Sequence, residues 1–115
     1  MNTMHPELAK DLDYIEHKLF NDWDAYGAKK PLKTTIKNVR KFLSAWPKEK
    51  PLPDKITPDG DGVITLHWII NSRLKLLLSF EKNIAYYGKY YPEFFSKDYK
   101  ANSKELMHEL HEVFS

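Results

Sequence analysis

Residues 62–80 read GVITLHWIINSRLKLLLSF and form the most apolar stretch of the chain. On both sides of the Asn71–Ser72 break, apolar residues recur with a period of two, which is typical of strands that bury one face. The stretch therefore predicts a β-hairpin. The residues expected on its buried face are Ile64, Leu66, Trp68, Ile70, Leu74, Leu76, Leu78 and Phe80.

The opposite face of this hairpin has a mixed character. Polar residues at positions 65, 67, 75 and 79 point away from the expected core, so this face is at least partly wet. Val63, Ile69 and Leu77 lie on the same side and are too apolar for a fully exposed surface. We therefore expect something else to cover part of it.

Further strands are predicted beside the hairpin. A third strand runs from Ile84 to about Gly88, after a turn at residues 81–83, and Lys55–Thr57 is expected to pair briefly as an edge strand before Pro58 stops it. Strands joined by such short connections form an antiparallel meander. The sequence predicts a sheet of three to four strands.

Three other segments carry apolar residues at helical spacing, at about residues 6–20, 33–46 and 103–114. Pro6 suits a first turn, Pro47 stops the second helix, and Asn102 is the expected N-cap of the third. The predicted fold is one α+β domain with the order α-α-β-β-β-α. The two N-terminal helices and the C-terminal helix pack against the sheet.

The composition limits the class of protein. A chain of 115 residues that is 42% hydrophobic can bury a core as a single domain. The absence of cysteine excludes disulfides, a thiol nucleophile and sulfur-ligated zinc. The N-terminus lacks the layout of a signal peptide, and no apolar run reaches the roughly 20 residues of a membrane helix. We expect a soluble, cytoplasmic protein.

Charge is unevenly distributed along the chain. The net charge is +2, but residues 1–26 carry −4 and residues 27–55 carry +7. The simpler explanation is attraction between two neighbouring helices; the alternative is a functional basic patch. That patch is a stripe at helical spacing that could bind phosphates, although no known nucleic-acid-binding motif accompanies it. Its residues are Lys33, Lys37, Arg40 and Lys41.

The Trp23–Ala28 segment (WDAYGA), followed by Pro58–Gly60 and a strand ending in Trp68, resembles a group of small bacterial proteins. These proteins carry a Trp-Asp-Gly-Tyr-Gly-Ala segment and a later Pro-Asp-Gly hairpin. The resemblance implies no activity, cofactor or partner. The chain departs from the group's pattern at Ala25, where glycine is usual, and at His67, where a glutamate often stands. Ala25 implies a slightly different turn.

We interpret Trp23–Ala28 as a plug whose Trp23 and Tyr26 rings pack back over the core. A ligand site built from Asp24 and Tyr26 is the alternative. Nothing else in the sequence points to such a site.

Motifs for catalysis or metal binding are not recognisable. The PDGDG run at 58–62 resembles a calcium loop, but Thr57 and Trp68 occupy the positions that require carboxylates, so we predict a turn. His108 and His111 lack a third strong ligand and are expected at the surface. The serines lie in no nucleophile motif, and no phosphate-binding glycine loop is present. We expect no enzyme activity, metal or cofactor.

Residues 86–99 are exceptionally rich in aromatic side chains, with seven rings in fourteen residues. Adjacent rings in a strand point to opposite faces, so some belong to the core and others face solvent. Exposed rings are favoured as interface anchors, and single-stranded nucleic acid could also stack on them. The predicted partner-binding residues are Tyr87, Tyr90, Tyr91, Phe94, Phe95 and Tyr99.

Two function classes follow from these features. The first is a non-catalytic protein-binding module, such as a stoichiometric inhibitor, an antitoxin, an immunity protein or a phage-borne or mobile-element-borne inhibitor of host defence, by analogy from size and exposed rings. Its partner is another protein, and a homodimer remains open. The alternative is a nucleic-acid-binding accessory protein that uses the basic helix at 33–46.

Overall fold

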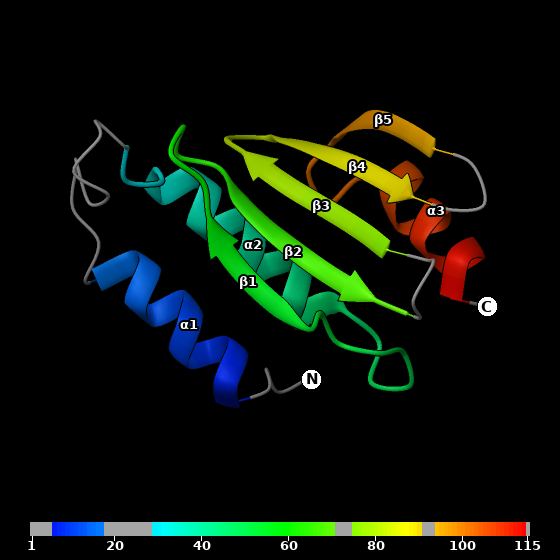
Figure 1. Ribbon diagram of the computed structural model, residues 1–115, viewed down its shortest axis with the longest axis horizontal. Coiled ribbons are helices and arrows are strands. Elements are labelled where there is room, and N and C mark those ends of the chain that lie inside the picture. Colours follow the sequence, from blue (N-terminus) through cyan, green and yellow to red (C-terminus); the bar gives the residue numbers. More distant parts are fainter. Residues whose placement is uncertain (1–5, 18–28, 71–74, 91–93, 115) are drawn as a thin grey trace.

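The computed structural model describes residues 6–17, 29–70, 75–90 and 94–114 (Figure 1). In these residues the chain forms three helices and five strands, in the order α1, α2, β1 to β5, α3. The bounds are α1 Pro6–His17, α2 Lys33–Ala45, β1 Lys55–Pro58, β2 Ile64–Ile69, β3 Lys75–Glu81, β4 Ile84–Tyr90, β5 Phe94–Lys100 and α3 Lys104–Phe114.

The described strands form one antiparallel sheet in the order β1-β2-β3-β4-β5, so each strand pairs with its neighbour in sequence. The α+β class, the meander and the flanking helices are confirmed. The number of strands is larger than predicted, because β5 was not recognised. Its sequence, FFSKDYK, lacks apolar alternation, since β5 is an edge strand with nearly all of its side chains exposed.

The core lies between the helices and one face of the sheet, here called the inner face. Leu66, Leu78 and Tyr87 stand opposite one another on β2, β3 and β4, and all three are buried. Figure 1 shows α2 and α3 behind the sheet and α1 beside β1. The buried residues of all three described helices join the same cluster.

Aromatic rings fill the centre of this core. The Phe42 ring on α2 lies 5.3 Å from Trp46, 5.7 Å from Phe80 and 6.2 Å from Trp68, measured between centroids. Phe114 of α3 adds a contact to Trp46 at 5.6 Å. Edge and tilted ring contacts of this kind are favourable beyond their burial, and they join α2 and α3 to the hairpin.

Polar contacts fix α2 against two turns. The buried Thr35 hydroxyl accepts a hydrogen bond from Lys82 N at 2.8 Å, in the turn between β3 and β4. Asn38 Nδ2 donates to Lys82 O at 2.7 Å, and Asn102 Nδ2 donates to Asn38 O at 3.1 Å. These bonds set the helix at a defined position along the strands.

Two local expectations were wrong. Ile70 is 40% exposed rather than buried, because β2 ends at Ile69 and the alternation ends with it. The hydroxyl that caps α3 belongs to Ser103, which accepts from Leu106 N at 3.2 Å, whereas Asn102 has a φ of 61° and bonds to α2. Leu74, Tyr91 and the Trp23–Ala28 segment lie outside the described residues. In the described part of the chain, no helix is long and apolar enough to cross a membrane.

Candidate protein-binding face

The face of the sheet that points away from the core is here called the open face. Its side chains form rows across the strands, and one row runs from Thr65 through Ser79 and Tyr86 to Asp98. The described helices all contribute their buried residues to the inner face. The open face is therefore the exposed side of the described fold.

Large apolar side chains lie on the open face. Phe94 is 65% exposed and Tyr90 is 45% exposed, and their ring centroids are 5.2 Å apart. The Tyr90 ring leans across Gly88, because an added Cβ at this glycine would lie 3.4 Å from Tyr90 Cε2. Ile69 at the end of β2 is also exposed. These residues lie at one end of the open face, with Lys75 of β3 between Ile69 and the two rings.

Five of the six rings predicted to bind a partner, all but Tyr91, are among the described residues, and the structure separates them. Tyr90 and Phe94 pair across β4 and β5 on the open face. Phe95 is 40% exposed on the inner side of β5, with its ring 6.0 Å from that of Tyr87. Tyr99 is partly buried against the core, with Lys97 Nζ 5.3 Å from its ring centroid.

Tyr87 does not belong to the predicted surface. It is 1% exposed, because its position opposite Leu78 turns the ring into the core. Its hydroxyl has no hydrogen-bond partner among the described residues. Burial, together with Glu109 and Tyr99, raises the pKa of this hydroxyl. Tyr87 is a core residue, and its assignment to the interface was wrong.

Polar groups lie beside the apolar part of the open face, on β1, β2 and β3. The Thr57 hydroxyl and His67 Nε2 are 2.8 Å apart, and the Thr65 and Ser79 hydroxyls are also 2.8 Å apart. Burial and the nearby charge of Lys55 lower the pKa of His67. The open face thus has rings and aliphatic groups at one end, beside hydroxyl, imidazole and charged side chains.

Acidic groups gather at the other end of the open face. Tyr86 lies between Glu81 and Asp98, one on each neighbouring strand. Partial burial raises the pKa of Tyr86, and the two carboxylates raise it further. This end of the face is therefore more negative than the end that carries Lys75.

The predicted basic patch is divided. Lys33, Lys37 and Lys41 are exposed along α2, but Arg40 turns toward α1. Its Nη2 lies 2.8 Å from Asp13 Oδ1 and also bonds Glu16 Oε1, and these bonds raise the pKa of Arg40. Part of the charge asymmetry is thus used to hold two helices together.

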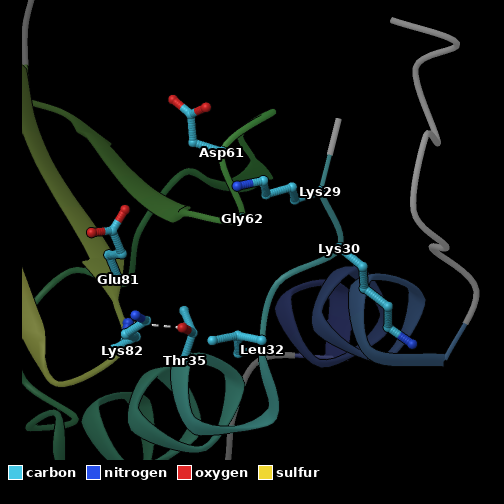
Figure 2. Close-up of a pocket in the computed structure, with 8 residues that line it drawn as sticks. All are labelled: Lys29, Lys30, Leu32, Thr35, Asp61, Gly62, Glu81 and Lys82. Atoms are coloured by element: carbon cyan, nitrogen blue, oxygen red, sulfur yellow. Dashed lines mark hydrogen bonds between the residues drawn. The ribbon is translucent and has the colours of Figure 1, made fainter. Parts of the chain in front are cut away.

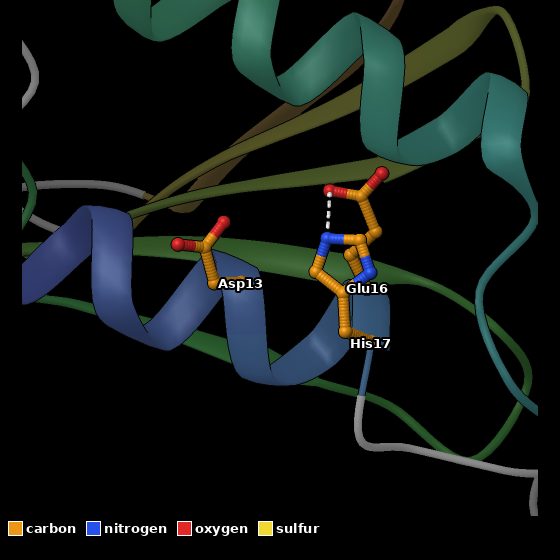
Figure 3. Close-up of side chains that lie close together, drawn as sticks. All are labelled: Asp13, Glu16 and His17. Carbon is orange, nitrogen blue, oxygen red and sulfur yellow. Dashed lines mark ion pairs between the residues drawn. The ribbon is translucent and has the colours of Figure 1, made fainter.

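Three side chains of the type that ligates cations lie close together on α1. Oxygen and nitrogen atoms of Asp13, Glu16 and His17 lie within 4.8 Å of one another, and this is the only such group found among the described residues (Figure 3). Arg40 already neutralises both carboxylates. The cluster is best explained as an ion-pair network between α1 and α2.

His108 and His111 are exposed on α3, and His108 Nε2 lies 3.6 Å from Glu112 Oε1.

A cavity of about 350 Å³ lies at the end of the sheet near the start of α2 (Figure 2). Sequence analysis did not identify it, because its walls come from segments far apart in the chain. Its lining mixes both signs of charge without a dominant one. The lining residues are Lys29, Lys30, Leu32, Thr35, Asp61, Gly62, Glu81 and Lys82.

The PDGDG run beside this cavity is a turn, as predicted. Asp59 N donates to Val63 O at 2.7 Å, and Gly62 N donates back to Asp59 O at 3.0 Å. Gly62 has a φ of 84°, a conformation that glycine adopts without strain. The carboxylate of Asp59 accepts from Asp61 N, so it stabilises the turn.

Comparisons of the chain with protein-family models, with curated proteins and with solved structures found no match. The function is therefore inferred from the surfaces of this fold. The open face, with its exposed rings, and the exposed lysines of α2 are the two surfaces with features of a binding site.

Proposed function

We propose that this protein is a non-catalytic protein-binding module, of the kind found in stoichiometric inhibitors, antitoxins and immunity proteins. It binds another protein through the open face of its sheet. The observation that carries the proposal is the pair of exposed, contacting rings of Tyr90 and Phe94 on that face.

Exposed rings of this size gain free energy when a partner covers them. Removing a large apolar side chain fully from water contributes roughly 1.5–3 kcal/mol, and aromatic side chains are enriched among the residues that dominate binding energy. Tyr90 and Phe94 are adjacent, so one partner surface can cover both.

The composition of the open face fits an interface. Ile69, Leu77 and Tyr86 extend the apolar region beyond the two rings, while His67 and Ser79 lie beside it. Protein interfaces combine an apolar, aromatic centre with a polar rim. The open face combines an apolar, aromatic end with polar groups beside it.

The rings are also preorganised. Tyr90 and Phe94 lie on paired strands, and Tyr90 rests across Gly88. A ring that is already held in place loses little side-chain entropy when it binds. A Cβ at position 88 would lie 3.4 Å from Tyr90 Cε2, which is ordinary van der Waals contact, so the ring packs directly over the backbone of Gly88.

The proposal is tested by affinity capture from the native cell with three baits: the wild type, Tyr90→Ala/Phe94→Ala, and Tyr14→Ala. Tyr14 is 58% exposed on α1, away from the sheet's open face, and serves as the matched control. We expect one protein in stoichiometric amount with the wild type and the control. We expect its loss with the double variant.

The captured protein is then purified and titrated against each bait by calorimetry. A one-to-one complex that weakens at least a hundredfold with Tyr90→Ala/Phe94→Ala supports the proposal. Equal binding by the wild type and a folded double variant would contradict it, since the open face would then play no part.

The second candidate function is nucleic-acid binding through α2, favoured by the exposed lysines at positions 33, 37 and 41. Neutralising phosphates with lysine gives binding that weakens steeply as salt increases. We expect retardation of short duplex or single-stranded DNA in a low-salt gel, and its loss with Lys37→Glu/Lys41→Glu. A gel without retardation would remove this function.

A further inference from the structure

We propose that, when its partner is absent, the open face binds the open face of a second copy and forms a two-fold symmetric dimer. The inference depends on the proposed function, because it assigns an alternative occupant to the same face. Partner binding and self-association are then mutually exclusive.

The charges on β3 are self-complementary. Lys75 and Glu81 lie at opposite ends of this strand and point to the same open face, since residues 76, 78 and 80 between them are buried. A two-fold axis parallel to the sheet and perpendicular to the strands reverses the strand direction of the second copy. It places Lys75 of one copy over Glu81 of the other, twice per dimer.

The apolar residues of β4 follow the same symmetry. Ile84 and Tyr90 lie at opposite ends of the strand, both on the open face, and are 44% and 45% exposed. The same axis places Tyr90 of one copy over Ile84 of the other. Both residues leave water in the dimer, and burial of apolar surface stabilises association.

The alternative face-to-face arrangement is unfavourable. An axis parallel to the strands keeps their ends in register and places Lys75 over Lys75 and Glu81 over Glu81. Like charges brought together at an interface cost free energy and suppress that pairing. The charge pattern therefore selects the axis perpendicular to the strands.

The size of the face is sufficient for a specific dimer. The axis perpendicular to the strands places each of the five described strands over the same strand of the second copy, so the two faces overlap across the whole sheet. With strands about 4.8 Å apart and about 3.4 Å per residue, the face has a projected area of roughly 500 Å². The accessible area of a side-chain surface exceeds its projection and approaches the roughly 800 Å² per partner of standard interfaces.

The test is light scattering coupled to size exclusion, followed by analytical ultracentrifugation, on the purified protein. We expect about twice the 13.6 kDa chain mass. Lys75→Glu and Glu81→Lys each replace two attractive contacts by repulsive ones, so each raises the dissociation constant about tenfold or more. The double variant exchanges the charges and restores the dimer.

Lys41→Glu is the matched control, because it reverses an exposed charge on α2, in the helix layer. It leaves the dimer unchanged. Circular dichroism and urea unfolding confirm that each variant is folded. A 13.6 kDa monomer at all concentrations, or a dimer that neither single reversal weakens, would overturn the inference.

The two proposals fail separately. Dimer formation is measured on the purified chain alone, whereas the proposed function depends on loss of a captured protein with Tyr90→Ala/Phe94→Ala. A monomer that still captures its partner through these rings leaves the proposed function intact and removes only the dimer. A dimer without any captured partner removes the proposed function, and the dimer then stands as a property of the fold.

Discussion

Trp46 and Trp68 donate their indole N–H groups to the same acceptor, the carbonyl oxygen of Pro51, each at 2.9 Å. Trp46 follows α2, and Trp68 lies on β2, with ring centroids 5.6 Å apart. Pro51 lies in the loop between α2 and β1. Its carbonyl oxygen has two lone pairs and accepts both bonds, so this loop is fixed to the core. This contact joins the helix layer to the sheet.

The shared acceptor predicts non-additive stability. Trp46→Phe and Trp68→Phe each remove one hydrogen bond and some packing, and we expect each to cost about 1–3 kcal/mol. The Pro51 oxygen keeps one donor in either single variant but loses both in the double variant. The double variant should therefore cost about 0.5–1 kcal/mol more than the sum. Urea unfolding of all four proteins measures this coupling, and strict additivity would show that the two bonds are independent.

The buried hydroxyl of Tyr87 predicts a stabilising substitution. It has no hydrogen-bond partner among the described residues, and a buried unsatisfied polar group costs about 1–3 kcal/mol. Tyr87→Phe keeps the ring and removes the hydroxyl, so we expect the free energy of unfolding to rise by about 0.5–1 kcal/mol. Tyr99→Phe, at a partly buried ring on the next strand, is the comparison. A loss of stability in Tyr87→Phe would indicate that the hydroxyl is hydrogen-bonded.

The lowered pKa of His67 predicts a pH dependence of stability. Burial and Lys55 hold this pKa below its ordinary value of 6.5, so between the two values the unfolded chain binds more protons than the folded chain. The contribution of neutral His67 is therefore complete above 6.5 and is lost as the pH falls toward the folded pKa.

His67→Gln removes this titration, and its amide can still bond Thr57. Unfolding in urea between about pH 5 and pH 8 should give a flatter acid side for the variant than for the wild type. Parallel profiles for the two proteins would assign the acid sensitivity to other groups.

Arg40 predicts a salt-sensitive link between α1 and α2. Its side chain is about one-third exposed, so we expect Arg40→Gln to cost about 1 kcal/mol or less at low salt and still less at high salt. Combining it with Glu16→Gln in a double-mutant cycle isolates the pair. The neighbouring exposed Lys41→Gln should stay within about 0.5 kcal/mol of the wild type. A cycle without coupling at low salt would contradict the ion pair.

The local pattern of apolar residues in the sequence was sufficient to predict most of the helices and strands. The alternation in residues 64–69 and 75–80 predicts strands with one buried face, because a period of two assigns side chains to faces without tertiary information. β5 escaped prediction, since an exposed edge strand has no buried face to create such a pattern. An exposed edge strand such as β5 is stabilised mainly by its hydrogen bonds to the neighbouring strand β4, which its own sequence does not reveal.

The candidate surface was less predictable from sequence. Adjacent rings such as Tyr86 and Tyr87 point to opposite faces, but only the register with β3 decides which one is buried. Arg40 is a similar case, because helical spacing places it in the lysine stripe. Its partners Asp13 and Glu16 are more than twenty residues away in sequence. Contacts between different elements of the fold therefore decide both the burial of Tyr87 and the direction of the Arg40 side chain.

Tyr90 and Phe94 face solvent in the monomeric chain, and we infer that they are kept for binding rather than for folding. The most direct measurement is the free energy of unfolding of monomeric Tyr90→Ala/Phe94→Ala, beside that of Tyr87→Ala. We expect a loss of about 1 kcal/mol or less for the double variant and about 3–5 kcal/mol for the buried ring. A loss above about 3 kcal/mol for Tyr90→Ala/Phe94→Ala would place these rings in a core and contradict their assignment to a binding surface.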